Sequence, residues 1–183
     1  MKKLIIGNFR TGSWFLHDSF IEKGFMPLGE LGNNTLNDRK NKISKFNKRS
    51  KVVGILHPSQ MQNSTTTCLR LCEIADEIIY LQRQNTFEQT VSYAVALKQT
   101  DRYDRSPWLR NRKIYKNTIN DTDLKNAFLK LEENYEKIQK LYEKFPDRIL
   151  TLEKDLTHKP YPNKYNYKGK WEPPYNFKML GDD

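Results

Sequence analysis

Cysteine is scarce in this sequence of 183 residues, which contains only Cys68 and Cys72. The two cysteines stand four residues apart in a segment with helical periodicity, so they offer neither a disulfide framework nor the four ligands of a structural zinc site. Long apolar runs are also missing, since no stretch approaches the roughly 20 residues that cross a bilayer, and the N-terminus lacks a signal-peptide pattern. We therefore expect a soluble, cytoplasmic protein without a membrane partner.

Two patterns of phosphate chemistry are missing as well. The lysine-containing phosphate loop, G-x-x-x-x-G-K-[ST], does not occur. No cluster of Asp or Glu suited to magnesium stands beside the first turn of the chain. These absences argue against a P-loop kinase, and they predict a site that needs no metal.

What the sequence has in excess is positive charge. Lys and Arg number 32 against 22 Asp and Glu, which gives a formal net charge of +10. Such a protein attracts anions, including nucleotides, polyanionic chains and nucleic acids. Seven basic residues fall within residues 39–51, and we interpret this run as a solvated helix face or loop in preference to a dedicated binding patch.

The length of the chain fits one domain with a single core. Hydrophobic residues make up 37% of the chain and aromatic residues 12%, which argues against general disorder. We expect one domain over residues 1–183. Its last part, about residues 158–183, is rich in Pro, Tyr and Lys and is expected to be an irregular tail wrapped over the surface.

Strand patterns alternate with helical patterns along the chain. Strands are expected at residues 2–8, 51–58, 76–83 and 147–156, and helices at 13–24, 63–75, 85–99 and 121–145. Residues 25–34, with Pro27, Gly29 and Gly32, are expected to be irregular or to hold a very short strand, leaving the sheet edge as a loop. The alternation predicts an α/β fold with a mainly parallel sheet flanked by helices on both faces.

The first strand runs into a basic turn. Parallel sheets bind ligands beyond the C-terminal ends of their strands, and there this strand is followed by Arg10, Thr11, Gly12 and Ser13 at the expected start of a helix. Unpaired N–H groups and the positive end of the helix dipole favour an anion at such a place. Arginine and hydroxyl side chains add donors. The turn is predicted to bind an anion, with an ordinary turn capped by Ser13 as the alternative.

A second basic position lies at the end of the third expected strand. Arg83 closes that strand, and Ser92 follows nine residues later inside the next helix, where both can meet one phosphate. Alone, this pair is a weak signal because an arginine after a strand is often a salt-bridge partner. Together with the first turn, it fits a nucleotide that carries phosphates at two places.

The stretch FRTGSWFL resembles the 5′-phosphosulfate loop of sulfotransferases, and IIYLQRQNTFEQTVSYA resembles their 3′-phosphate segment. The similarity covers roughly residues 2–30 and 51–98, and its wording is closest to bacterial carbohydrate sulfotransferases. It implies a three-layer, P-loop-NTPase-like fold with 3′-phosphoadenosine 5′-phosphosulfate (PAPS) as co-substrate, whose sulfuryl group passes to a hydroxyl or amine. The implied donor-binding residues are Arg10, Thr11, Gly12, Ser13, Trp14 and Phe15, with Phe15 against the adenine, and Arg83 and Ser92 at the 3′-phosphate.

Two positions of the loop depart from the family pattern. Phe9 replaces the common proline, and Trp14 replaces a hydroxyl residue that contacts phosphate in the family. The transfer also needs a base near the 5′ turn. The resemblance offers His57, which matches a histidine of cytosolic sulfotransferases, and Glu30, which matches a glutamate of the bacterial branch; both stay open. With Arg10, they are the expected catalytic residues, while His17 is expected to pack.

The acceptor is not identified by the sequence, and we expect a small molecule or a glycan. Basic residues near the expected fourth helix could face an acidic glycan or solvent; they are Arg102, Arg105, Arg110 and Arg112. Two alternatives stay open. One is a nucleic-acid-binding module, which would use the basic run and the aromatic residues of the tail. The other is a degenerate sulfotransferase that binds the nucleotide without turnover.

Overall fold

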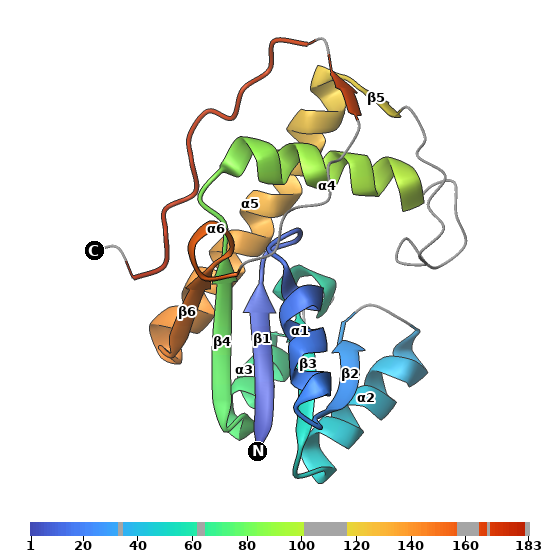
Figure 1. Ribbon diagram of the computed structural model, residues 1–183, viewed down its shortest axis with the longest axis vertical. Coiled ribbons are helices and arrows are strands. Elements are labelled where there is room, and N and C mark those ends of the chain that lie inside the picture. The colour runs from blue at the N-terminus through green and yellow to red at the C-terminus, as the bar shows by residue number, and fades with distance from the viewer. Residues whose placement is uncertain (33–34, 62–64, 101–116, 157–164, 168, 182–183) are drawn as a thin grey trace.

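A sheet of five parallel strands forms the centre of the fold (Figure 1). The computed structural model describes residues 1–32, 35–61, 65–100, 117–156, 165–167 and 169–181. Across the sheet, the strands are β2 (Met26–Glu30), β3 (Val52–Leu56), β1 (Lys2–Gly7), β4 (Glu77–Gln82) and β6 (Arg148–Thr151). The predicted α/β class with a parallel sheet is confirmed.

Strand β1 lies between β3 and β4 and is buried on both faces. Its residues Leu4, Ile5 and Ile6 have no exposed surface, as expected for a central parallel strand covered by helices. Because successive side chains point to opposite faces, Ile5 packs with one apolar cluster, and Leu4 and Ile6 pack with the other. A short apolar run thus serves two halves of the core.

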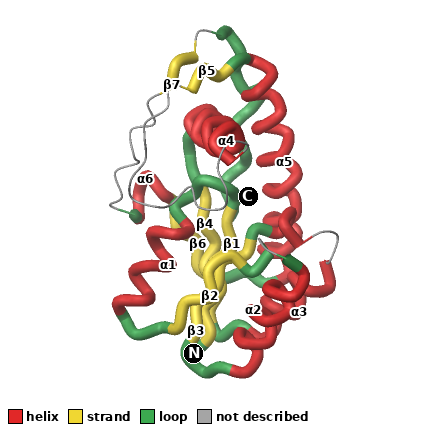
Figure 2. Tube along the Cα trace, turned by 90° about the vertical axis from the view of Figure 1, so that its right-hand side faces the viewer, coloured by secondary structure: helices red, strands yellow, loops and turns green. Residues whose placement is uncertain are grey.

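Helices cover both faces of the sheet (Figure 2). The helices over the two faces are α1 (Ser13–Glu22), α2 (Leu36–Lys48), α3 (Thr65–Ile74) and α5 (Asp121–Lys144). Helix α1 packs on one face through Leu16 and Phe20. On the other face, α2, α3 and α5 contribute Phe46, Leu71 and Ile138 to a common cluster. The arrangement has three layers, with helix, sheet and helix in order.

Helix α4 (Thr86–Thr100) has a different position from the other long helices. It lies across the C-terminal ends of the strands instead of on a face of the sheet (Figure 1). Its residues Val91, Ala94 and Val95 pack against Leu124 and Ala127 of α5. Side chains of α4 therefore reach the turns that follow the strands.

Two segments near the β2 edge follow one of the alternatives that the sequence left open. Residues 26–30 form a short strand that pairs with β3 in parallel, with a register shift between Pro27 and Gly29, so this edge of the sheet is a strand and not a loop. Burial of Leu28 and Leu31 against the sheet explains why this strand forms despite its Pro and Gly residues. The basic run lies mostly in α2, which is anchored by the fully buried Phe46.

The C-terminal part of the chain also differs from the prediction. The expected last strand stops at Thr151, where Asp155 Oδ2 accepts a hydrogen bond from the Thr151 N–H and the short helix α6 (Leu152–Asp155) begins. Strands β5 (Asn117–Ile119) and β7 (Tyr165–Tyr167) form a second, two-stranded parallel sheet. No apolar pattern long enough to predict that sheet is present in either three-residue strand.

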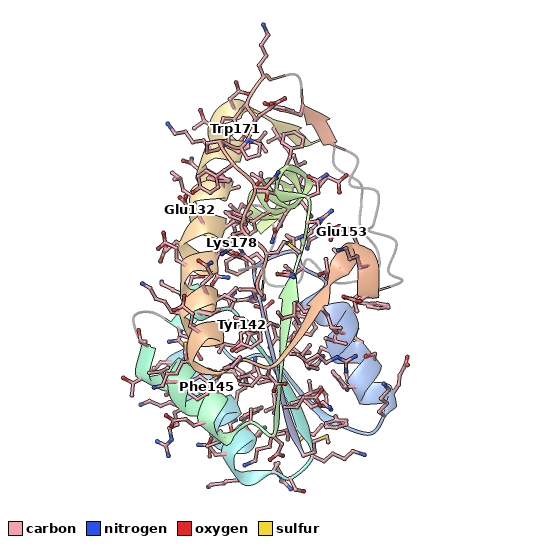
Figure 3. All side chains as sticks on the ribbon, turned by 90° about the vertical axis from the view of Figure 1, so that its left-hand side faces the viewer. Glu132, Tyr142, Phe145, Glu153, Trp171 and Lys178 are labelled. Carbon is pink, nitrogen blue, oxygen red and sulfur yellow. The ribbon has the colours of Figure 1, made fainter. Side chains whose placement is uncertain are left out.

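The tail after residue 170 is irregular, as expected, and most of its residues lie outside the core, but two of its side chains are buried. Phe177 stacks on Phe128 of α5 at a ring distance of 5.3 Å, and Leu180 joins the large cluster on that face of the sheet. Figure 3 shows Trp171 and Lys178 of this segment beside α5. Phe177 and Leu180 therefore complete the core, which the sequence did not predict.

Cys68 and Cys72 are buried in α3 as free thiols. Burial raises the pKa of Cys68 to about 11 and that of Cys72 to about 12, so neither thiol ionises readily at neutral pH. This agrees with the expectation of ordinary helix residues. Within the residues that the structure describes, no helix has the length and apolar character needed to cross a membrane.

Candidate functional site

The strand order places a crevice between the C-terminal ends of β1 and β4. The chain leaves β1 through α1 toward β2, whereas it leaves β4 toward α4, α5 and β6 on the opposite side. Parallel sheets bind their ligands at such a point, where successive connections diverge. The turn of residues 8–12 and the end of β4 line this crevice.

The turn after β1 has a tightly wrapped backbone. Arg10 has a φ of 65° and Gly12 has a φ of 83°, both in the left-handed region, which costs little for glycine but is uncommon for arginine. A Cβ on Gly7 would lie 2.7 Å from Thr11 Oγ1. The Thr11 hydroxyl donates to the Asn8 carbonyl at 2.8 Å, so this fully buried side chain holds the turn from within.

Helix α4 grips this turn with three side chains. Arg10 Nε donates to Ser92 Oγ at 2.8 Å, and Gln89 Nε2 donates to the Phe9 carbonyl at 2.7 Å. The rings of Phe9 and Tyr93 are stacked, with centroids 4.7 Å apart. The structure therefore pairs Ser92 with Arg10. The sequence had predicted Ser92 as a partner of Arg83.

Helix α5 holds two turns together through a pair of buried amides, which we name the amide clasp. Asn134 Nδ2 donates to Asn8 Oδ1 at 3.0 Å, and Asn134 Oδ1 accepts from the Ser59 N–H at 2.8 Å. Asn8 Nδ2 in turn donates to the Leu131 carbonyl at 2.8 Å. The clasp fixes the turn after β1 relative to the turn after β3.

Asn134 was missed from the sequence, although a signal for it exists. It stands between Leu131 and Ile138 on the apolar stripe of α5 and is fully buried. A polar residue inside such a stripe must find hydrogen-bond partners. Gln89 and Tyr93 were missed because nothing in their helical spacing distinguishes them from surface residues.

Arg83 lies at the end of β4 in an acidic environment. Its Nη2 donates to Glu88 Oε2 at 2.8 Å and its Nε to Glu153 Oε1 at 3.2 Å. The Arg83 side chain is only 7% exposed, whereas the side chains of Glu88 and Glu153 are 55% and 30% exposed. The structure thus places two carboxylates where the sequence predicted a 3′-phosphate.

His57 follows β3 and is almost completely buried. Its Nδ1 lies 2.6 Å from the Gly7 carbonyl, an acceptor only, so Nδ1 carries the proton and Nε2 is left with a lone pair. That Nε2 is 3.9 Å from Glu30 Oε1. Burial lowers the pKa of His57, while the Glu30 charge and the Gly7 carbonyl act in the opposite direction.

Glu30 lies at the end of β2 with its side chain 13% exposed. Its Oε1 accepts from Trp14 Nε1 at 3.0 Å and its Oε2 from Gln60 Nε2 at 3.2 Å. The two base candidates of the sequence, Glu30 and His57, are therefore neighbours and belong to one cluster.

The first turn of α1 presents three of the predicted donor-binding residues. Gly12 is the N-cap, and Ser13 is the first helical residue and is buried. Phe15 is 40% exposed. Trp14 instead points toward β2, where its indole meets Glu30. His17 is 1% exposed and packs, as predicted.

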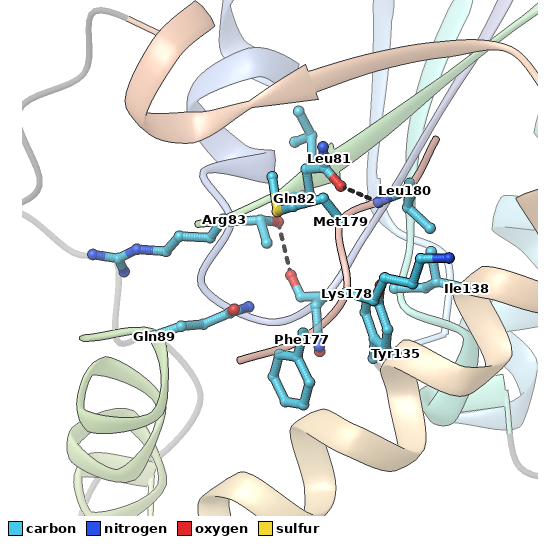
Figure 4. A pocket seen from close by; sticks show the side chains of 12 residues that line it. Leu81, Gln82, Arg83, Gln89, Tyr135, Ile138, Phe177, Lys178, Met179 and Leu180 are labelled. Carbon is cyan, nitrogen blue, oxygen red and sulfur yellow. Dashed lines mark hydrogen bonds between the residues drawn. The ribbon is translucent and has the colours of Figure 1, made fainter. Parts of the chain in front are cut away.

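A small hollow lies in the crevice, walled on one side by the tail (Figure 4). The first turn and the end of β4 contribute its polar lining with Asn8, Thr11, Gln82 and Arg83. The Leu180 N–H donates to Gln82 Oε1 at 2.7 Å, so the tail is hydrogen-bonded to the strand end. Residues Arg102, Arg105, Arg110 and Arg112 lie outside the described part of the chain.

No three His, Cys, Asp or Glu side chains of the described residues gather so that they could hold a metal ion. Comparisons with models of protein families and with curated proteins find no match to this chain.

Proposed function

We propose that this protein is a sulfotransferase that moves the sulfuryl group of PAPS to a hydroxyl group, with a carbohydrate as one class of acceptor. One observation carries the proposal. The basic turn after β1 is joined to α4 by the Arg10–Ser92 hydrogen bond, and it lies beside the His57–Glu30 pair at the same sheet edge. A turn suited to binding an anion and a pair of side chains that can take a proton thus lie close together.

The turn supports binding of a phosphosulfate group. Because α1 begins at Ser13, the first N–H groups of the helix have no acceptor within it, and the helix dipole adds positive potential. Arg10 supplies a full charge at the same place. The left-handed backbone at Gly12 brings the main chain close to such a ligand.

The spacing of two glycines around the first turn supports a P-loop-NTPase-like identity for the fold. Gly7 and Gly12 have the spacing of the two glycines in the phosphate loop of nucleotide-binding proteins. Ser13 occupies the lysine position of that loop and Trp14 the position of its metal-binding hydroxyl. The cation of this loop is instead Arg10, which favours sulfuryl transfer over phosphoryl transfer to or from a nucleoside triphosphate.

The transfer requires a base that takes the proton of the substrate hydroxyl. The oxygen of that hydroxyl forms a bond to sulfur, the bond from sulfur to the 5′-phosphate oxygen breaks, and adenosine 3′,5′-bisphosphate leaves. Glu30 is the more exposed of the paired side chains and takes the proton, with His57 Nε2 only 3.9 Å from its Oε1. Arg10 and the loop N–H groups stabilise charge on the leaving oxygen.

The test is a thermal-shift titration with adenosine 3′,5′-bisphosphate. A ligand that binds only the folded state stabilises it by about 2.7 kcal/mol at 100 times its Kd, so the melting temperature of the wild type is expected to rise. The variant Arg10→Ala should lose this shift. Arg148→Ala is the matched control, because Arg148 is 60% exposed at the start of β6, at the opposite edge of the sheet.

Absence of any shift in the wild type would overturn the proposal. Equal, salt-dependent shifts with unrelated oligonucleotides would favour the nucleic-acid-binding alternative, for which α2 supplies basic residues. A normal shift without transfer to any of a panel of hydroxyl acceptors would identify the degenerate form.

A further inference from the structure

Trp14 occupies a loop position whose side chain would be expected to face the nucleotide, yet it turns away from the crevice. Its Nε1–H donates to Glu30 Oε1 at 3.0 Å. Its ring also meets the ring of His17 edge-on, with centroids 5.3 Å apart at an interplanar angle of 67°. The indole is therefore part of the contact between α1 and the end of β2.

The site around the indole depends on a glycine. Gly29 has a φ of 62°, and a Cβ built on it would lie 3.1 Å from Trp14 Cη2, tighter than an ordinary contact. The Gly29 N–H donates to His17 Nε2 at 3.2 Å. Gly29 and Glu30 are consecutive, so the same bulged backbone that accommodates the ring also presents the carboxylate.

Both oxygens of the Glu30 carboxylate receive a neutral N–H donor. Trp14 on α1 donates to Oε1, and Gln60 in the 3₁₀ helix η1 (Pro58–Met61) donates to Oε2. The Lys42 ammonium donates to the main-chain carbonyl of Glu30. These two donors fix the orientation of the carboxylate.

We propose that Trp14 is a positioning residue, whose indole N–H holds the Glu30 carboxylate with Oε1 directed at His57 Nε2. Trp14 does not bind the nucleotide. The catalytic meaning of this role rests on the proposed function, in which Glu30 takes the acceptor proton. Trp14 thus positions the proposed base, Glu30, instead of contacting the sulfuryl donor.

The arrangement predicts an electrostatic coupling between Trp14 and His57 through Glu30. The Glu30 charge raises the pKa of His57 against the effect of burial, so a carboxylate that is no longer held should leave the pKa of His57 lower. Other titratable groups facing the pair are Tyr93 on α4, His17 on α1 and Lys42 on α2. His17 contacts the Trp14 ring itself, so its titration is followed together with that of His57.

The experiment is NMR on the ¹⁵N-labelled protein, with Trp14→Phe as the first variant because it keeps an aromatic ring. The chain has three tryptophans, so the indole signal that disappears belongs to Trp14. We expect this signal to move upfield in Glu30→Ala and to follow the Glu30 titration in the wild type. We also expect Trp14→Phe to lower the pKa of His57, read from its ring nitrogens. Trp171→Phe, which changes a tail residue, is the matched control.

An unchanged pKa of His57 in Trp14→Phe would overturn the proposal. If Trp14→Phe folds poorly, Glu30→Gln tests the same contact through the indole signal, and a Trp14 signal that does not move in that variant would overturn the proposal as well. A Trp14 indole signal that responds to adenosine 3′,5′-bisphosphate but not to Glu30→Ala would identify a nucleotide contact instead. These readouts need no turnover, so failure of the wild type to bind the nucleotide would count against the proposed function alone.

Discussion

Arg10 and Arg83 follow neighbouring strands of one sheet, yet their surroundings differ in charge. Arg10 Nε meets the neutral hydroxyl of Ser92, whereas Arg83 meets the carboxylates of Glu88 and Glu153. A hydroxyl partner offsets none of a cation's charge, whereas each carboxylate partner offsets part of it. The first corner of the crevice, at Arg10, is tied to α4 through Ser92, and the second corner, at Arg83, is suited to holding α4 and α6 at the end of β4.

The largest expected difference between the two corners is in stability. Replacing Arg83 by Met leaves two carboxylates without their cation, and we expect a loss of about 2 to 3 kcal/mol in the free energy of unfolding, reduced from the fully buried case because both acids reach solvent. Replacing Arg10 by Met removes a hydrogen bond to a neutral group and should cost about 1 kcal/mol. Urea denaturation of the two variants measures both values. Equal losses would abolish the distinction.

A smaller effect is expected when the acidic corner is neutralised. In the double variant Glu88→Gln, Glu153→Gln, a phosphate no longer competes with carboxylates for Arg83. Since an exposed ion pair is worth up to about 1 kcal/mol, the affinity for adenosine 3′,5′-bisphosphate should rise about threefold to fivefold. Isothermal titration calorimetry measures the change, and Glu143→Gln on the exposed side of α5 controls for the loss of an acid. Unchanged or weaker binding would mean that Arg83 serves structure alone.

The smallest effect concerns pH at the first corner, because burial and the Glu30 charge shift the pKa of His57 in opposite directions. The net result is a lowered pKa in the folded state. Below about pH 6.5, His57 therefore binds a proton in the unfolded state more readily than in the folded state. The free energy of unfolding is at its full value above that pH and decreases as the pH falls below it. We expect His57→Asn, which keeps a donor for the Gly7 carbonyl, to flatten this slope in unfolding experiments between about pH 7 and pH 5. A slope as steep as that of the wild type would assign it to other groups.

The sequence predicted the central fold well because the information needed is local. Patterns that span only a few residues predict the secondary structure of these elements, namely the apolar runs of β1, β3 and β4 and the apolar stripe of α5. For β2 the sequence left a very short strand and an irregular segment open, since Pro27 and Gly29 argue against a strand and only burial of Leu28 in the core outweighs them. In the tail, the irregular backbone was predicted, but the burial of Phe177 and Leu180 was not.

The candidate site was predicted at the level of its turns but not of its partners. Arg10, Glu30 and His57 were named from the sequence, and the structure brings them to one edge of the sheet. Which side chain meets which depends on the placement of α4 and α6 over that edge. Those placements decide that Ser92 faces Arg10 and that Glu153 faces Arg83, and no spacing along the chain encodes them.

The buried end of the tail affects the order in which the protein can be completed during synthesis. Phe177 and Leu180 enter the core beside α5 and the end of β4, yet the ribosome adds them after every strand of the sheet has been made. Until they arrive, Phe128 lacks its stacking partner Phe177 and the large apolar cluster lacks Leu180. The nascent chain is therefore expected to depend on chaperones longer than its early, central strand would suggest.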